Sequence, residues 1–266
     1  MPGGLLVLVL VFVAACGGAA SPATESPSRW EPPVTKPLLH LNFDDLTADF
    51  DTLLPGVVNV GVAEVRVEIA TAHAGRVRLA PDPAGRGAAR FPGHSEAADH
   101  PAAALVVWEV KGGALSPGKR DFTFGAAFNL DDVSEGGEAD NGDNVVQRGL
   151  FADAQQFKLQ VDHGVPSCRI AGTDGAVVVK WAGNVTRGKW MAATCTRQGR
   201  LVRLTLWDVA SGRSLGTVQG EGDIGALHFD STTPFGVGAK VLEDGRVSSS
   251  SDQFNGVIDE VYFDVQ

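Results

Sequence analysis

Residues 157–207 constrain the fold most, because apolar and polar residues alternate along them in runs that Gly, Pro and Asp separate. In residues 157–162 the apolar side chains Phe157, Leu159 and Val161 alternate with polar ones, which is the pattern of a β-strand with one face in water. The same alternation returns at residues 201–207 after a turn of the hairpin type. Consecutive strands with short connections predict an antiparallel sheet.

Two of these extended runs carry cysteines, Cys168 and Cys195. Cysteines on nearby antiparallel strands can reach the Cα separation of roughly 4.4–6.8 Å that a disulfide allows. Closing a loop of this length stabilises a fold by roughly 3–4 kcal/mol on the chain-entropy model. The alternative is a pair of free, buried thiols. We expect the bridge, because the start of the chain indicates an oxidising compartment.

The start of the chain has the features of an export signal. Residues 5–15 form an apolar run that is too short for the roughly 20 residues of a spanning helix. The sequence Val13-Ala-Ala-Cys16 resembles a bacterial lipobox, which implies that residues 1–15 are a lipoprotein signal peptide and that Cys16 is lipidated. An ordinary cleaved signal peptide is the alternative, since no Lys or Arg precedes the apolar run. With Cys16 lipidated, the two remaining cysteines are an even number in a compartment where disulfides persist.

The rest of the chain divides into a tether and one domain. Residues 16–36 are rich in Ser, Pro and Ala and lack a periodic apolar face, so we expect a flexible tether. Residues 37–266 contain no second linker of this composition and are long enough for one sizeable core. The expected location is the extracellular face of a bacterial membrane, with a lipid anchor as the link to the bilayer.

The net charge is −10, and this excludes one large class of partners. A strongly acidic chain repels phosphate backbones, and no basic stripe with interleaved aromatic residues is present, so nucleic acid is not an expected partner. The same charge keeps a surface protein soluble and attracts cations such as calcium.

Short strand patterns fill the remaining sequence as well. Residues 122–130 give the longest alternation, and residues 65–69, 105–108 and 257–265 supply further strands. No stretch shows a sustained helical period bounded by caps. Many short strands with Gly and Pro turns predict an all-β fold, a two-sheet antiparallel β-sandwich or jelly roll.

Four segments in order carry a resemblance to a known family: LLHLNFDD at 38–45, RDFTFGAAF at 120–128, GKWMAAT at 188–194 and FNGVIDEVYF at 254–263. Together they resemble the laminin G-like domains of the concanavalin A-like lectin/glucanase superfamily. The resemblance covers residues 37–266 and implies a concanavalin A-like jelly roll. It does not fix a function, because that fold carries lectins, glycoside hydrolases, lyases and adhesion modules.

The glucanases of this superfamily place acids at alternating positions of one strand, in a Glu-x-Asp-x-x-Glu pattern. No such run occurs here. We therefore expect no enzyme and no catalytic residue, but a non-catalytic binding module of a cell-surface lipoprotein. The expected ligand is a glycan or a cell-envelope polysaccharide. The alternatives are a protein-binding adhesion or envelope scaffold module, and an unrecognised polysaccharide hydrolase or lyase.

The resemblance also implies a structural calcium ion, with Asp44, Asp45 and Asp259 as its ligands. An inward-facing carboxylate must be hydrogen-bonded or metal-bound, and Asp259 would share the inner face with Val257 and Val261 if the alternation is unbroken. The alternative is that Asp259 accepts backbone N–H groups at a β-bulge. Residues 138–144 offer a second set of oxygen atoms, for which a solvated acidic loop is the competing interpretation.

Two tryptophans are candidates for a sugar-stacking surface. Trp181 lies in a turn-rich stretch, and Trp207 alternates out of phase with Leu204 and Leu206. Carbohydrate recognition on this fold needs exposed aromatic faces, or a polar cluster on loops at one sheet edge or on the concave face. The alternative for both rings is packing against a neighbouring strand.

Overall fold

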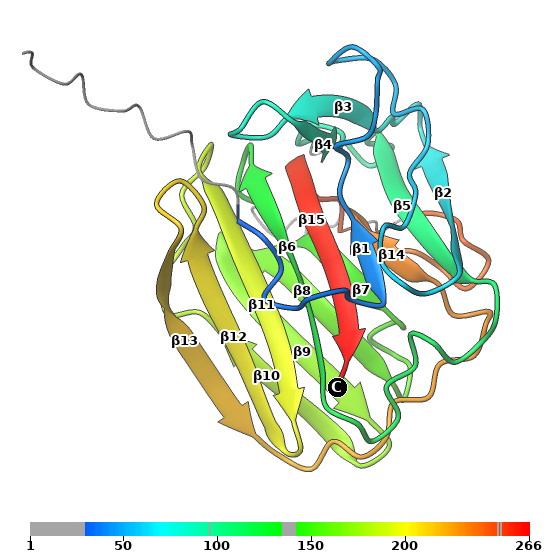
Figure 1. Ribbon diagram of the computed structural model, residues 1–266, viewed down its shortest axis with the longest axis vertical. Coiled ribbons are helices and arrows are strands. Elements are labelled where there is room, and N and C mark those ends of the chain that lie inside the picture. Colours follow the sequence, from blue (N-terminus) through cyan, green and yellow to red (C-terminus); the bar gives the residue numbers. More distant parts are fainter. Residues whose placement is uncertain (1–29, 96, 135–141, 249, 251) are drawn as a thin grey trace, which may run out of the picture.

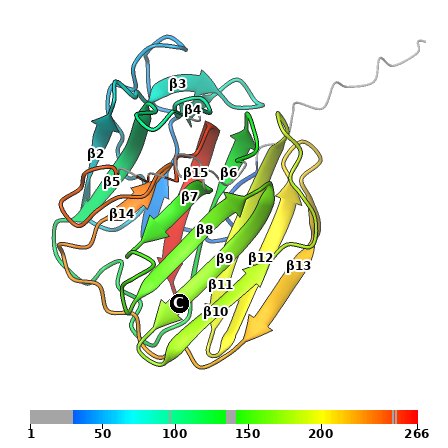
Figure 2. The same cartoon turned by 180° about the vertical axis from the view of Figure 1, so that it is seen from behind.

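Two antiparallel sheets packed face to face form the domain in the computed structural model (Figure 1; Figure 2). It describes residues 30–95, 97–134, 142–248, 250 and 252–266. Cys16, the predicted signal peptide and most of the predicted tether therefore lie outside the described residues. Within the described part, every regular element is a strand, and no helix is available that could cross a membrane.

The eight-stranded sheet has the order β13-β12-β11-β6-β15-β4-β3, with β1 also paired to β15. Its strands are β1 (Leu39–Leu41), β3 (Arg78–Pro81), β4 (Gly87–Arg90), β6 (Phe122–Leu130), β11 (Trp190–Gln198), β12 (Leu201–Asp208), β13 (Arg213–Glu221) and β15 (Gly256–Val265).

The seven-stranded sheet has the order β10-β9-β8-β7-β14-β5-β2. Its strands are β2 (Val65–Ala72), β5 (Ala102–Glu109), β7 (Asp143–Arg148), β8 (Gln156–Asp162), β9 (Val165–Gly172), β10 (Gly175–Lys180) and β14 (Phe235–Val237). All pairings in both sheets are antiparallel, so the all-β sandwich predicted from the sequence is confirmed.

Phenylalanine rings from both sheets meet in the core. The ring of Phe157 in β8 lies 4.7 Å from that of Phe124 in β6 and 5.3 Å from that of Phe263 in β15. These side chains are fully buried, as the period-2 pattern predicts for the inner face. Each contributes about 1.5–3 kcal/mol through its burial, so this aromatic cluster fixes how the sheets face each other.

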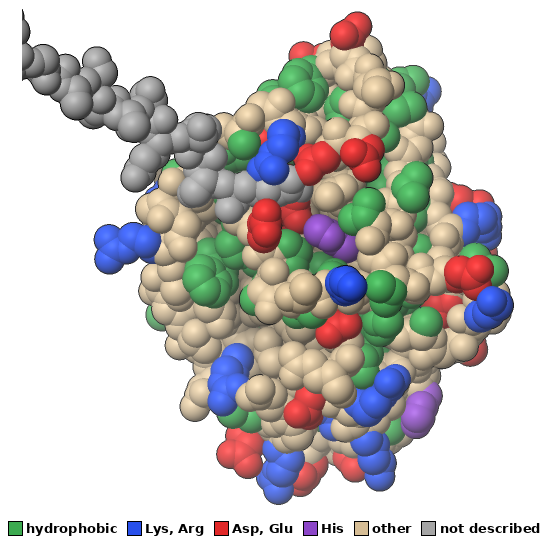
Figure 3. Space-filling model, in the orientation of Figure 1, with side chains coloured by type: hydrophobic (Ala, Val, Ile, Leu, Met, Phe, Trp, Pro, Cys, Tyr) green, Lys and Arg blue, Asp and Glu red, His purple; other side chains and the backbone are tan. Residues whose placement is uncertain are grey.

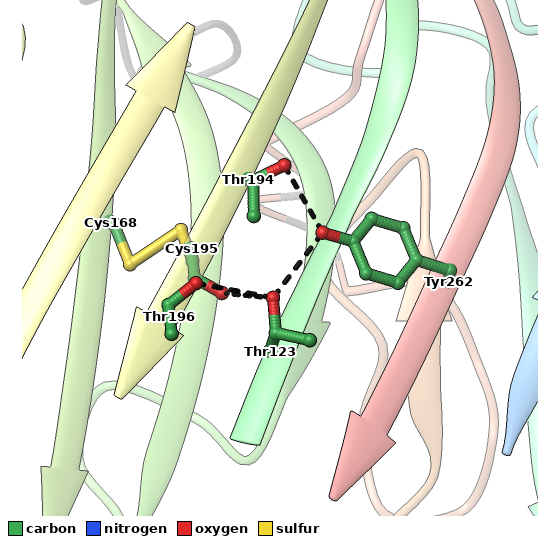
Figure 4. Close-up of a disulfide and its surroundings, with 6 residues drawn as sticks. All are labelled: Thr123, Cys168, Thr194, Cys195, Thr196 and Tyr262. Atoms are coloured by element: carbon green, nitrogen blue, oxygen red, sulfur yellow. Dashed lines mark hydrogen bonds between the residues drawn. A yellow bond between two sulfur atoms is a disulfide. The ribbon is translucent and has the colours of Figure 1, made fainter. Parts of the chain in front are cut away.

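The disulfide crosses this core. Cys168 in β9 belongs to the seven-stranded sheet and Cys195 in β11 to the eight-stranded sheet, and their Cα atoms are 6.0 Å apart (Figure 4). The predicted Cys168–Cys195 bridge is confirmed. It joins the two layers rather than adjacent strands of one sheet, so it holds the sandwich closed.

A short N-terminal strap, residues 30–36, lies against the eight-stranded sheet. Trp30 is only 6% exposed, and its ring centroid is 6.0 Å from that of Tyr262. The sequence predicted a flexible tether up to residue 36, and Trp30 within that segment packs on the edge of the domain. The structure shows that packing, because Tyr262 and Ala192 form an apolar surface outside the main core.

Candidate functional site

A hollow of about 170 Å³ lies on the outer face of the seven-stranded sheet, over strands β8, β9 and β10. Figure 2 shows these strands side by side at the front of the domain. Its lining consists of Phe151, Gln156, Lys158, Gln160, Ser167, Arg169, Val178 and Lys180. This side of β8 faces outward because the alternate residues Phe157, Leu159 and Val161 fill the core.

The register of the strands brings these side chains into rows. Lys158 in β8 is opposite Arg169 in β9, which is opposite Val178 in β10. On the other side, Lys158 is opposite Gln147 in β7. Side chains directly opposite each other in antiparallel strands lie about 4.5–5.5 Å apart at Cβ. Residues far apart in sequence thus form one continuous polar floor.

Hydrogen bonds that involve side-chain amides connect the residues of this floor. Asn144 Nδ2 donates to Gln147 Oε1 at 2.6 Å, and Gln147 Nε2 donates to the carbonyl oxygen of Gly149 at 2.7 Å. Gln156 Nε2 donates to the same carbonyl at 3.0 Å. Gln156 Oε1 in turn accepts a hydrogen bond of 2.8 Å from Arg169 Nη1. A connected network of this kind orients its members before a ligand arrives.

The turn after β7 depends on a glycine. Gly149 has φ 76°, and a Cβ atom there would lie 2.2 Å from the carbonyl oxygen of Gln155. Any other residue at position 149 would be strained, because the backbone is left-handed and because its Cβ atom would clash with this carbonyl oxygen. This turn presents Phe151 at the rim of the hollow.

Phe151 and Arg169 form the exposed rim of the hollow. The Phe151 side chain is 78% exposed, and the Arg169 guanidinium carbon lies 4.8 Å from its ring centroid. Such a contact is worth about 0.5–1 kcal/mol at an exposed site. It holds a large aromatic face in water beside hydrogen-bond donors, which is the combination that sugar rings contact.

Lys158 lies at the inner edge of the hollow beside Asp252. Its Nζ is 3.1 Å from Asp252 Oδ2, and Lys240 Nζ is 3.5 Å from Asp252 Oδ1. Burial lowers the pKa of the Lys158 ammonium, while the Asp252 carboxylate acts in the opposite direction. Burial also lowers the pKa of the Arg169 guanidinium. Both groups are cations in a partly dry environment, where they interact more strongly with an anion than in bulk water.

The predicted calcium ligands are placed differently from the sequence expectation. A β-bulge between Asp259 and Tyr262 breaks the alternation that the sequence argument assumed. Val257 consequently packs in a small cluster with Ala80 and Ala88, whereas Val261 is in the main core. The assumption of an unbroken inner face was therefore wrong, since an extra residue in one strand re-aims the side chains around it.

Asp259 caps this bulge. Its Oδ1 accepts a hydrogen bond of 2.8 Å from the backbone N–H of Glu260, whose φ of 52° is left-handed. This hydrogen bond is the one expected from the alternative interpretation, in which the Asp259 carboxylate accepts backbone N–H groups at a β-bulge. Asp44 is half-buried and Asp45 is exposed in the segment after β1.

No group of three His, Cys, Asp or Glu side chains that could hold a metal ion occurs within the described ranges. The side chains of Asp44, Asp45 and Asp259 thus do not supply the cluster that the resemblance implies, and the calcium ion stays a prediction. Of the second predicted set, residues 138–141 lie outside the described part. Asp143 is fully buried in β7, where its Oδ1 accepts a hydrogen bond of 2.7 Å from Asn255 Nδ2, so it is not part of a solvated loop.

Neither predicted tryptophan borders the hollow. Trp181 is half-buried against the core, and a Cβ atom on Gly216 in β13 would be 3.3 Å from its ring. Trp207 is half-buried in the cluster of Trp30 and Tyr262. The structure places both rings against neighbouring strands, and a ligand role for either one stays a prediction.

Sequence reasoning missed Phe151, Gln156 and Arg169 as a group. The outward positions of residues 156–160 follow from the alternation, but their partners depend on the strand register. The signal in the sequence that could have indicated this site was a single aromatic residue, Phe151, in a glycine-containing turn at residues 149–155.

The chain matches no protein-family model and no curated protein sequence. Solved structures do resemble it. One is a structure of botulinum neurotoxin type C, a toxin whose cell entry depends on interaction with two ganglioside molecules. It shares 12% identity with this chain and has a TM-score of 0.57, and the match covers 87% of this chain and 48% of the other.

The binding domain of botulinum neurotoxin DC in complex with rat synaptotagmin II shares 10% identity, with a TM-score of 0.55 over 86% of this chain and 48% of the other. The LG1-3 region of the laminin alpha2 chain shares 14% identity, with a TM-score of 0.44 over 55% of this chain and 27% of the other. The chain spans less than half the length of each of these structures. The neurotoxin matches, together with the topology described above, show that the chain has a two-sheet jelly-roll fold, which is the fold that the family resemblance in the sequence implied.

Proposed function

We propose that the protein is a non-catalytic carbohydrate-binding module and that its ligand occupies the hollow over β8, β9 and β10. The observation that carries the proposal is the exposed Phe151 ring held beside Arg169 above a floor of connected amides. Ligand sites combine an apolar contact surface with a few fixed polar groups that set orientation. The ring supplies the contact with the apolar face of a sugar, and the amides and Arg169 supply hydrogen bonds to its hydroxyl groups.

The neurotoxin structures support this proposal in a general way only. The partners of the type C toxin in cell entry are gangliosides, which are glycolipids. At 12% identity the likeness extends to the fold and does not locate a site.

A glycan array probed with the full chain tests the proposal. We expect binding to a restricted set of glycans and a loss of up to about tenfold with Phe151→Ala, in line with the roughly 0.5–1.5 kcal/mol that an aromatic contact provides. Phe50→Ala is the matched control, because Phe50 is also exposed, at 44%, and does not line the hollow. Equal glycan binding by the wild type and Phe151→Ala would reject the site, and no glycan binding would reject the function.

A second candidate function is protein binding by an adhesion or envelope scaffold module. The observation in its favour is an apolar ridge, defined as Val58, Val60 and Val62, whose exposed fractions are 75%, 48% and 63%. Exposed apolar groups that gather on one segment mark interaction surfaces. Binding to an envelope protein that is lost with Val58→Ser/Val62→Ser and kept with Phe151→Ala would favour this candidate.

We also propose that the chain is anchored to the extracellular face of a bacterial membrane by lipid on Cys16. The support is the lipobox-like sequence and the disulfide, which persists in an oxidising compartment. Metabolic labelling with a fatty acid, compared between the wild type and Cys16→Ala, tests the anchor. Equal labelling of both proteins would reject it.

A further inference from the structure

The hollow carries one sign of charge. Among the described residues, its lining includes the cations Lys158, Arg169 and Lys180 and no carboxylate. The chain as a whole has a net charge of −10, so the positive charge of the hollow is opposite in sign to the net charge of the protein. On the face shown in Figure 3, the side of the eight-stranded sheet, acidic and basic side chains are interspersed.

The three cations are not equivalent. Asp252 lies 3.1 Å from Lys158 and offsets its charge. Arg169 and Lys180 therefore provide the excess positive charge that a ligand would meet. In a hollow lined by one sign of charge, such an excess concentrates anions from solution.

Arg169 is oriented for the recognition of an anion. One of its guanidinium nitrogens, Nη1, donates to Gln156 Oε1 at 2.8 Å, and its guanidinium carbon lies 4.8 Å from the ring centroid of Phe151. These two contacts restrict how the guanidinium group can move beside the hollow. A guanidinium group can present two parallel N–H donors to a carboxylate or sulfate.

Lys180 lies on the neighbouring strand at the diagonal position. Arg169 pairs with Val178, and Lys180 is two residues farther along β10 on the same face. Diagonal neighbours of this kind are about 7–8 Å apart, within reach of long side chains. One anionic group, or two on adjacent sugar residues, can contact both cations.

We propose that the hollow binds acidic saccharides, with the anionic group of a sugar held by Arg169 and Lys180 and the ring of that sugar against Phe151. This inference rests on the proposed function and adds the chemical class of its ligand. Carboxylate and sulfate share the required chemistry, and the experiment below separates them.

The test compares polymers by affinity electrophoresis with the full chain at two salt concentrations. The probes are polygalacturonate, the same polymer with its carboxyl groups reduced to alcohols, dextran sulfate and dextran. We expect the wild type to bind polygalacturonate, dextran sulfate or both at least about tenfold more tightly than the neutral partner, and binding to weaken as salt rises. Binding to one acidic polymer alone identifies carboxylate or sulfate as the preferred group.

Variants distinguish specific binding in the hollow from nonspecific electrostatic attraction. Arg169→Gln should lose about tenfold or more in affinity for the acidic polymer, and Lys180→Gln should lose less because Lys180 is exposed. Arg200→Gln is the control, since Arg200 is exposed in the turn between β11 and β12 and does not line the hollow. Unfolding curves of each variant check that the fold is kept.

Three results would overturn the inference. Equal affinity for neutral and acidic polymers, with binding that still depends on Phe151, would remove the acidic class and leave the carbohydrate-binding function. Equal losses with Arg169→Gln and Arg200→Gln would show unspecific attraction. An absence of binding to every polymer and to the glycan array would reject the function as well.

Discussion

Arg148 Nη2 lies 3.0 Å from Glu109 Oε2, and both side chains are 1% exposed. Arg148 Nη1 also donates to the carbonyl oxygen of Leu115 at 2.9 Å, and its Nε donates to that of Thr233 at 3.0 Å. Burial lowers the pKa of Arg148, and the Glu109 carboxylate opposes that shift. This pair ties β5, β7 and two long connections together at one end of the sandwich.

Glu109→Gln should therefore destabilise the protein strongly. The change leaves Arg148 buried without its counter-charge, which costs about 3–5 kcal/mol in comparable pairs. Urea unfolding measures the loss. Lys111→Gln is the control, because its partner Glu64 and Lys111 itself are exposed and such pairs contribute about 0–1 kcal/mol. Similar small losses for both variants would contradict the structural role of the buried pair.

The stability of the fold should fall in alkaline solution because of Tyr262. Burial raises the pKa of Tyr262 to about 12 from 10.0, with hydrogen bonds to Thr123 and Thr194 in the opposite direction (Figure 4). The phenol ionises more readily in the unfolded chain, so its contribution is complete below pH 10 and is lost as the pH rises toward about 12. The loss is of the order of 3 kcal/mol.

This prediction has a direct optical readout. Tyr262 is the one tyrosine of the chain, so ultraviolet absorbance of tyrosinate reports it alone. In Tyr262→Phe the alkaline loss of stability attributed to this group should disappear. Titration of native Tyr262 near pH 10 would show that the phenol is accessible to water and would contradict the prediction.

Reduction of the Cys168–Cys195 bridge should weaken the sandwich without unfolding it at once. The chain-entropy model gives a loss of roughly 3–4 kcal/mol for a loop of this length. Urea unfolding with and without reductant measures the difference. The stability of Cys168→Ala/Cys195→Ala should not respond to reductant, and an equal response of that variant would place the effect elsewhere.

Asp259→Ala should destabilise the protein both with calcium and with chelator. The carboxylate accepts the N–H of Glu260 at the bulge, and an N–H buried without a partner costs about 1–3 kcal/mol. Thermal unfolding in calcium and in chelator distinguishes the two roles of Asp259. A wild-type midpoint that falls on chelation, together with an Asp259→Ala variant that does not respond to chelator, would support the calcium ion implied by the family resemblance.

The sequence was sufficient for the features that depend on local alternation. The inward positions of Phe157 and Phe124 follow from a period of two, and so does the sandwich built on them. The Cys168–Cys195 bridge could be predicted because both cysteines fall on extended runs that were expected to be neighbouring strands.

Features that depend on register or on one extra residue could not be predicted. The bulge at Asp259 shifts every later side chain of β15 by one position, and no turn residue marks it in advance. The contact of Phe151 with Arg169 joins a turn to a strand two elements later, so it exists only once the strands are aligned. The candidate site therefore could not be predicted, because it depends on the register of the strands.

The place of β15 also determines the order in which the protein can fold. This strand lies between β6 and β4 and pairs with β1, so an interior strand of the eight-stranded sheet comes later in the sequence than every strand it pairs with. During synthesis the edges of β1 and β6 that pair with β15 therefore stay open until β15 has been made. Contacts this distant in sequence form slowly, and a growing chain with open strand edges associates readily with others. A chaperone that holds the chain until residue 265 has been made would have its largest effect on this sheet.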